Sequence, residues 1–414
     1  MKSIWILLFV VLLAIAGCKH NAPATASPVD STKPIRVSTG SGDGAEPAIT
    51  SASDGTVYVA WVEHHQEGKA DVLFARFNNN QMQGSAIRVN PQPGAATAWR
   101  GDPPTISVAP DQTIFISWTA KVESESGHAT DIYVSASRDK GTSFDAPVKV
   151  NDDKRPAVHG MHSLSVAKDG RLYVAWLDER NISPQPATDM KMKQGTSGHH
   201  MESNREVFIA SSTDNGRTFS ANKQVATNVC PCCKTALATA GDGRVYLSWR
   251  QVLPGNFRHI AVTSSTDQGQ TFSTPKIVSD DQWMLAGCPV SGATINVSND
   301  GALHVLWYSA GKNGETGLYS SESKDAGNTF GPRTLIAKGE IHGTPVLTNG
   351  SAGLVAVWEN SAGKISTARL GENNEPVQLE NGNLPAAVET SNGLMTAYID
   401  QTAEPQAIFV SKAH

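Results

Sequence analysis

Cysteine, histidine and methionine side chains recur in a few short stretches of this chain. Apart from Cys18, the cysteines lie in two of them, Cys230-Pro-Cys232-Cys233 and Cys288-Pro289. Thiolate, thioether and imidazole groups together favour a soft metal, copper first and zinc next. Cys-x-Cys-Cys matches no regular zinc-finger spacing, so the metal stays open. The predicted ligands are His159, Met161, His162, Cys230, Cys232, Cys233, Cys288 and His342.

Disulfides are the competing interpretation of the same cysteines. In an oxidising compartment, an even set of four cysteines usually pairs, and neighbouring loops can bring Cα atoms within about 6 Å. One cysteine of the 230–233 stretch bonded to Cys288 would then join two loops. One disulfide beside a His/Met copper site is compatible with both interpretations. The pattern alone leaves the choice open.

A short apolar segment ending in an aromatic residue recurs along the chain. Asp-Gly or Asn-Gly pairs precede most copies, as β-hairpin turns require. A repeat of four strands with apolar faces predicts a propeller blade, because one such sheet cannot bury both of its faces alone. The copies are Val57–Trp61, Ile114–Trp118, Leu172–Trp176, Val245–Trp249, Leu303–Trp307, Leu354–Trp358 and, more weakly, Leu394–Tyr398.

A second repeat, Ser-x-Asp-x-Gly-x-Thr-Phe, predicts hairpin corners. Its Asp can accept backbone N–H groups, its Gly takes a positive φ, and its Phe anchors the corner in the core. It occurs at Ser137–Phe144 (with Ser143 for Thr), Ser212–Phe219, Ser265–Phe272 and Ser323–Phe330, so the structural aspartates are Asp139, Asp214, Asp267 and Asp325. The pattern resembles the Asp box, or bacterial neuraminidase repeat, of sialidase-type β-propellers.

The two repeats together predict an all-β fold, a β-propeller of seven blades with four strands each. Residues 34–39 read like the fourth strands of other blades, and we expect them to complete the last blade and close the ring. Six blades is the alternative, if the last segment is only a latch. We assign residues 1–17 to a lipoprotein signal peptide, 18–32 to a lipidated tether and 33–414 to a single domain.

The N-terminus predicts an anchored, extracytoplasmic protein. An apolar run from Ile4 to Ala16 precedes Ile15-Ala-Gly-Cys18, which resembles a bacterial lipobox, so Cys18 is the predicted lipid attachment site. The expected location is the bacterial cell envelope, at the outer membrane or on the periplasmic side. A net charge of −5 gives no reason to expect nucleic acid, and we expect a monomer bound to the membrane through its lipid.

The family resemblance implies glycoside hydrolysis with three arginines on the substrate carboxylate, a Tyr nucleophile and an Asp acid/base. The candidates here are Arg100, Asp102, Arg250 and Tyr308. Three hypotheses follow: a soft-metal-binding surface protein, a sialidase-type glycoside hydrolase, and a non-catalytic scaffold that binds protein or glycan and has structural disulfides. Other polar groups expected at the central channel could bind a small anion or a sugar. They are Glu46, Glu179, Arg180, Lys234 and Glu359.

Overall fold

The computed structural model describes residues 33–38, 40–124, 127–182, 204–285, 289–350, 352–372 and 375–413. They belong to one compact unit, Thr32–His414. The predicted signal, tether and lipid attachment site, together with Cys288, lie outside the described residues. Apart from a 3-10 helix, η1 (Gln66–Gly68), the regular structure in the described ranges is all β, in antiparallel sheets. No helix among these residues is long and apolar enough to cross a membrane.

Three sheets hold four strands each. The first runs β20 (Ala293–Val297), β21 (Leu303–Ser309), β22 (Gly317–Ser323) and β23 (Thr334–Lys338). The second runs β24 (Ile341–Gly350), β25 (Gly353–Asn360), β26 (Lys364–Arg369) and β27 (Val377–Asn381). The third runs β1 (Ile35–Arg36), β30 (Ala407–Lys412), β29 (Gly393–Asp400) and β28 (Asn383–Thr390). Ile35 lies opposite Val410, which confirms the predicted pairing of the N-terminal segment with the last strand.

An eight-stranded sheet consists of two sets of four strands. The first set is β12 (His159–Val166), β13 (Leu172–Asp178), β14 (Arg205–Ser212) and β15 (Lys223–Val229). The second set is β16 (Ala236–Thr239), β17 (Val245–Leu253), β18 (Phe257–Ser265) and β19 (Lys276–Ile277). The two sets are linked through Val229, which lies opposite Gln251.

A ten-stranded sheet also divides into two sets. One contains β2 (Asp43–Ser51), β3 (Val57–His64), β4 (Ala70–Asn78), β5 (Gln81–Met82) and β6 (Ile87–Arg88). The other contains β8 (Thr105–Val108), β9 (Ile114–Lys121), β10 (Thr130–Ser137) and β11 (Val148–Lys149). The short strand β7 (Ala96–Thr97) pairs with both β4 and β9 and so joins the two sets.

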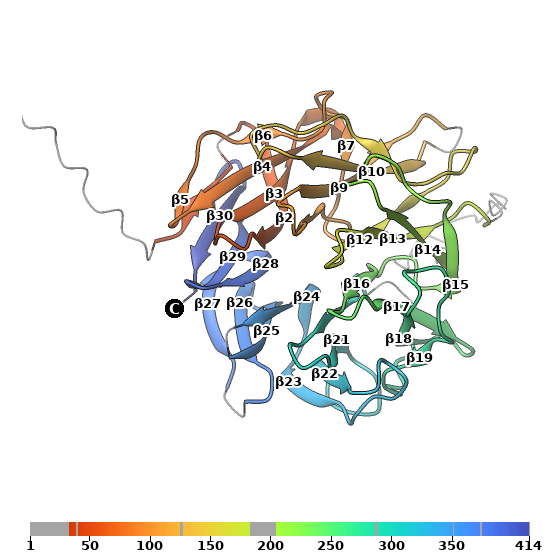
Figure 1. The fold of residues 1–414 in the computed structure, drawn as a ribbon. Helices are drawn as coiled ribbons and strands as arrows, with labels where there is room; N and C mark the ends of the chain where they lie inside the picture. Colours follow the sequence, from red (N-terminus) through yellow and green to blue (C-terminus); the bar gives the residue numbers. More distant parts are fainter. Residues whose placement is uncertain are drawn as a thin grey trace, which may run out of the picture. The chain divides into compact units, whose positions relative to one another are not determined.

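The first strand of each set contacts the first strand of the next. We call β2, β8, β12, β16, β20, β24 and β28 the first strands; they contact one another in this order, and β28 contacts β2. In Figure 1 the labelled first strands β2, β12, β16, β24 and β28 lie around the centre of the set of sheets. The hydrophobic core lies between neighbouring sheets: Trp61, Trp176, Trp249 and Trp307 of the second strands are fully buried, and clusters of buried residues join strands of neighbouring sheets.

The Asp-box corners form one hydrogen-bond pattern four times. In the third copy, Ser265 Oγ donates to Asp267 Oδ1 at 2.7 Å, and Thr271 N donates to the same oxygen at 2.8 Å. In the fourth copy, the hydroxyl and backbone N–H of Thr329 lower the pKa of Asp325 to about 2. Hydrogen bonds to a carboxylate favour its charged form. The aspartates therefore stabilise the turns.

These corners and the His159–His162 stretch lie at opposite ends of the strands. Leu172, at the start of β13, lies opposite Ser212, which opens one Asp box. At the other end of β12 and β13, His159 lies opposite Asp178. Any site built at the beginnings of the first strands is therefore separate from the Asp boxes.

Candidate functional site

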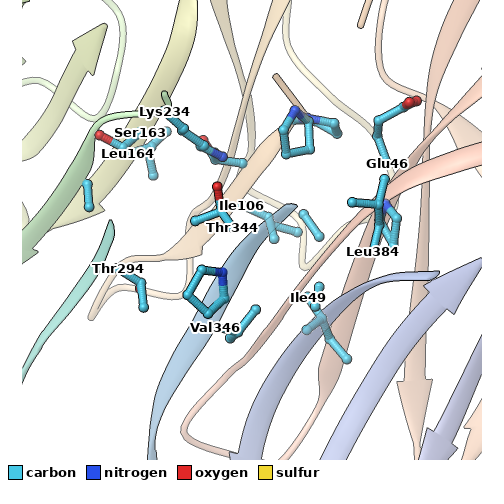
Figure 2. Close-up of a pocket in the computed structure, with 18 of the residues that line it drawn as sticks. Glu46, Ile49, Ile106, Ser163, Leu164, Lys234, Thr294, Thr344, Val346 and Leu384 are labelled. Carbon is cyan, nitrogen blue, oxygen red and sulfur yellow. The ribbon is translucent and has the colours of Figure 1, made fainter. Parts of the chain in front are cut away.

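A pocket of about 280 Å³ lies among the first strands. Every first strand contributes lining residues, together with the segments that precede them, and Figure 2 draws 18 of the lining residues and labels ten of them. We call this cavity the central pocket. Its inner wall is mostly apolar, while Glu46, Arg100 and Lys234 add charge. The labelled lining residues are Glu46, Ile49, Ile106, Ser163, Leu164, Lys234, Thr294, Thr344, Val346 and Leu384.

Backbone bulges shape the mouth of the central pocket. The pairing register shifts near the beginning of β2, β12, β24 and β28. At each shift one residue has a positive φ: Glu46 (47°), Met161 (54°), Gly343 (72°) and Leu384 (47°). A bulge of this kind bends the strand and re-aims the next side chains. For the three residues other than glycine this conformation is strained, and such strain is often found at functional sites.

Arg100 is held at the pocket by a buried carboxylate. Its Nη2 lies 2.7 Å from Glu359 Oε2, and the Glu359 side chain is fully buried. Glu359 also interacts with His342 Nδ1 at 2.9 Å and accepts a hydrogen bond from Asn383 Nδ2 at 2.7 Å. With its oxygens occupied, Glu359 is a positioning residue for Arg100, whose own side chain remains 38% exposed.

Lys234 is the second cation of the pocket. Burial lowers the pKa of Lys234 to about 8, and the nearby charge of Asp102 opposes this effect. Asp102 is itself buried and accepts hydrogen bonds from the backbone N–H of His162 at 3.1 Å and from its Nδ1 at 2.9 Å. Burial alone would raise the pKa of Asp102, but the charge and hydrogen bonds of His162 lower it. His162 Nε2 is buried and has no hydrogen-bond partner among the described atoms.

Glu46 is the carboxylate that lines the pocket. Its Oε2 lies 2.7 Å from His64 Nε2, at the end of β3. The hydrogen bond to Glu46 raises the pKa of His64, although burial opposes the shift. The carboxylate of Glu46 therefore stabilises the charged form of the His64 imidazole.

The other two predicted catalytic residues lie elsewhere. Arg250 is fully buried and donates to the carbonyl oxygens of Ser291 at 2.9 Å and Tyr308 at 3.1 Å. Its guanidinium stacks on Trp283, and Tyr308 packs edge-on against the same ring. Neither residue lines the central pocket. Of the four predicted catalytic candidates, Arg100 lines the pocket, and Asp102 is not itself in the lining but stands in the chain between the lining residues Gly101 and Pro103.

Three cysteines form a buried sulfur cluster at the beginning of the β16 set. Cys230 Sγ lies 3.5 Å from Cys233 Sγ and 3.9 Å from Cys232 Sγ. Cys230 and Cys233 are free thiols, whereas Cys232 is disulfide-bonded. Arg258 Nη1 donates to Cys230 Sγ at 3.0 Å. We call these four residues the cysteine cluster.

The predicted mixed sulfur and imidazole centre is not assembled among the described residues. The three sulfurs lie within 4.8 Å of one another, and no histidine nitrogen joins them at that distance. Instead, each predicted histidine has a nearby carboxylate: His159 faces Asp153, and the partners of His162 and His342 are given above. Met161 packs in the same buried core as the three cysteines. Binding of copper or zinc stays a prediction.

Part of this arrangement has no signal in the sequence. The interaction of Arg100 with Glu359 joins residues 259 positions apart. Arg258 lies in an ordinary strand, and nothing in the residues beside it indicates the contact with Cys230. The one clue is that Arg258 is a charged residue in a strand that is otherwise mostly buried. A buried charge requires a partner.

Comparisons with known proteins give the fold and a repeat family. The BNR repeat-like domain model matches residues 55–366. No curated protein matches the sequence. Among solved structures, a protein of unknown function from Dyadobacter fermentans DSM 18053 is similar over 93% of this chain and 100% of its own, with 13% identity and a TM-score of 0.52.

Two further solved structures are enzymes by their titles. The Hadza microbial sialidase Hz136 is similar over 79% of this chain and 66% of its own, with 15% identity and a TM-score of 0.51. A PL25 ulvan lyase bound to -[GlcA(1-4)Rha3S]- is similar over 92% of this chain and 96% of its own, with 12% identity and a TM-score of 0.54. At these identities the likeness concerns the fold.

Proposed function

Because the chain belongs to the BNR repeat-like domain family, we propose that it is a seven-bladed β-propeller that hydrolyses an acidic saccharide in the central pocket. The circular order of contacts among the first strands supports the blade count. The pairing of β1 with β30 supports closure of the last blade by the N-terminal segment. Closure of this kind leaves no free sheet edge between the first and last blades.

The size and lining of the pocket suit one sugar unit. Ligand pockets usually measure about 300–1,000 Å³, are mostly apolar and carry a few placed polar groups. At about 280 Å³, this pocket is slightly smaller than that range. The inner ends of the first strands supply apolar contacts for a sugar face. Glu46, Arg100 and Lys234 supply the polar groups.

The proposal that the substrate is acidic rests on two cations of the pocket, Lys234 and Arg100. Lys234 is mostly protonated at pH 7, since burial lowers its pKa only to about 8. Arg100 is fixed in direction by Glu359 and remains partly exposed. A carboxylate or sulfate group on the saccharide would meet both charges, and Arg binds such groups in a fixed planar geometry.

Glu46 is the proposed general acid/base. It lines the pocket, and its Oε2 lies 2.7 Å from His64 Nε2. A carboxyl group in hydrogen-bond reach of the glycosidic oxygen can protonate the leaving group. Arg250 and Tyr308, which the sialidase resemblance suggested, have no part in this proposal because they lie outside the pocket lining.

Turnover of acidic and neutral saccharides tests the proposal. Fluorogenic sialosides and uronides would be compared with a neutral arabinofuranoside, using the wild type, Lys234→Met, Arg100→Gln and the exposed control Arg155→Gln. We expect acidic substrates to be preferred and each pocket variant to raise KM about tenfold, since a hydrogen bond to a charged group contributes about 1.5–3 kcal/mol. The control should match the wild type. Absence of turnover of every acidic substrate contradicts the proposal.

We also propose that the chain is exported and anchored through Cys18. The lipobox resemblance supports this, and so does the disulfide of Cys232, because disulfides persist in oxidising compartments. Labelling with a radioactive fatty acid should mark the wild type and not Cys18→Ser. Equal labelling of both would contradict the anchor.

A further inference from the structure

Trp99 is an exposed aromatic side chain next to the central pocket. It is 45% exposed, whereas the other tryptophans among the described residues, such as Trp61 and Trp307 in the second strands, are at most 6% exposed. It lies between β7 and β8, directly before Arg100 and Gly101, which both line the pocket. Exposure of a single apolar side chain is common, so what matters here is how the indole is held.

The turn that begins at Trp99 is fixed along its length. The backbone N–H of Asp102 donates to the Trp99 carbonyl oxygen at 2.7 Å, a hydrogen bond typical of a β-turn. Asp102 is buried and accepts two hydrogen bonds from His162. Arg100 is held by Glu359 at 2.7 Å. The turn therefore has little freedom, and it carries an aromatic ring and a cation at neighbouring positions.

The absence of a side chain at Gly101 makes room for the indole. A Cβ added at Gly101 would lie 2.5 Å from Trp99 Cη2 and 2.8 Å from both Cζ2 and Cζ3. The six-membered ring of the indole thus lies directly against Gly101, which is a residue of the pocket lining. Trp99 itself is not in the lining. The exposed part of the ring therefore lies next to the central pocket and outside it.

We propose that Trp99 is a second saccharide subsite, on which the sugar unit next to the one in the central pocket stacks. This subsite rests on the proposed saccharide binding and extends it from one sugar unit to an oligosaccharide. A pocket of about 280 Å³ suits one unit, so the next unit of a chain lies outside it, where the indole is. An indole offers a large, flat apolar surface with an N–H at its edge, which suits a sugar face of C–H groups with hydroxyls around it.

The turn then contacts two features of one ligand. Arg100 meets the acidic group of the first unit, and Trp99 meets the apolar face of the second. Both contacts are prepared before binding, because the turn is fixed by its own hydrogen bonds, and such preorganisation reduces the cost of ordering on binding. The expected ligands are therefore saccharides of two or more units with an acidic unit at one end.

Isothermal titration calorimetry with saccharides of different length tests the subsite. Thio-linked probes avoid hydrolysis: the methyl glycosides of sialic acid and of glucuronic acid have one unit, and the same acidic sugars joined to lactose have three. Aryl glycosides are unsuitable, because their aromatic group would itself stack on Trp99. We expect the wild type to bind a three-unit probe about tenfold more tightly than its one-unit counterpart, because stacking on the indole buries apolar area.

Variants of the turn show whether this difference comes from Trp99. Trp99→Ala should bind probes of both lengths equally, with the one-unit affinity unchanged, and Trp99→Phe should keep part of the difference. Gly101→Ala keeps the indole but displaces it, so it should reduce the difference as well. The matched control is Val377→Ala, which removes a side chain of β27 that is 53% exposed and should keep the full difference. Thermal melting verifies that each variant is folded.

The results distinguish the subsite from the pocket. If no probe binds, the proposed function is contradicted, and the subsite with it. If one-unit probes bind and three-unit probes bind no better, or if Trp99→Ala keeps the wild-type difference, the subsite is wrong and the pocket is not. An equal loss of affinity for both lengths in Trp99→Ala would also overturn the subsite, because the indole would then act on the pocket itself.

Discussion

The two ends of the same β-sheets differ in how they use the repeat. At one end, four Asp-box corners make the same hydrogen bonds with the same residue types, as at Asp267 and Asp325. At the other end, equivalent bulges carry Glu46, Met161, Gly343 and Leu384, four different residue types on a similar backbone. Uniform chemistry accompanies turn formation, and varied chemistry surrounds the central pocket. The end with the Asp boxes therefore serves the fold, and the end at the central pocket is where we expect the function.

Removal of the pocket carboxylate should give the largest effect. Glu46→Gln keeps the shape of the side chain and cannot transfer a proton, so we expect kcat on an acidic saccharide to fall by about 100-fold or more. Kinetics and thermal melting should be measured together. The exposed Glu375→Gln is the matched control and should leave kcat unchanged. A kcat for Glu46→Gln within a factor of three of the wild type would remove Glu46 from the proposed mechanism.

Replacement of an Asp-box carboxylate should have the opposite profile. Asp214→Asn weakens the hydrogen bonds from Ser212 Oγ and Thr218 Oγ1, which measure 2.7 Å and 2.6 Å. We expect a stability loss of about 1 kcal/mol, small because solvent screens this exposed corner, with KM and kcat unchanged. Urea unfolding measures the loss. A change in KM without a change in stability would contradict the division between the two ends.

The two ends should also respond to pH in opposite directions. At the Asp boxes the folded pKa is depressed, to about 2 at Asp325, so their stabilisation is complete above the ordinary value of 3.8 and is lost as the pH falls toward 2. At the pocket, the hydrogen bond to Glu46 raises the pKa of His64 above 6.5. That contribution is complete below pH 6.5 and is lost as the pH rises through the higher folded value.

Both pH dependences can be tested by urea unfolding. The unfolding midpoints of the wild type, Asp214→Asn and His64→Gln would be measured between pH 2 and 9. We expect Asp214→Asn to flatten the acid side of the stability curve and His64→Gln to flatten the side above pH 6.5. A steeper alkaline side in His64→Gln would show that the sign given for the Glu46–His64 pair is wrong.

The smallest predicted difference is the one between two glycines with positive φ. Gly343 has φ +72°, and an added Cβ would lie 3.0 Å from Leu384 Cδ2; Gly170, with φ +86°, has open space around it. Both Gly→Ala changes place a side chain in the left-handed region, but only Gly343→Ala also crowds a neighbour. We expect a loss of about 1 kcal/mol or more at Gly343 and less at Gly170. Equal urea midpoints for Gly343→Ala and Gly170→Ala would mean that the bulge at Gly343 accommodates the added methyl group without cost.

Local repeats made much of the fold predictable. The recurring apolar segments correspond to second strands such as β13 and β17, and the likeness of residues 34–39 to other strands predicted the pairing of β1 with β30. These signals are local in sequence, and one chain contains several copies of each. The same repeats support the proposed arrangement of the sheets as propeller blades.

The site was less predictable, because its contacts join distant segments. Residue type and position in the repeat placed Arg100, Lys234 and Glu359 among the candidate channel groups, but they could not indicate that Glu359 fixes Arg100. The histidines were expected beside the cysteines, whereas buried carboxylates such as Asp102 pair with them. A carboxylate lowers the free energy of a buried imidazole more reliably than a chance thiol does, and the sequence alone does not say which will be near.

The pairing of β1 with β30 has a mechanical consequence. The strand β1 is two residues long, and its attachment is extended by hydrogen bonds from Val37 N to the Ile408 carbonyl oxygen and from Ile408 N to Ser38 Oγ, both 2.8 Å. A pull on the N-terminal side of the chain would load these few bonds before any other strand. Under tension, β1 should therefore detach from β30 before any other strand separates. A cross-link between β1 and β30 should raise the force needed to unfold the molecule.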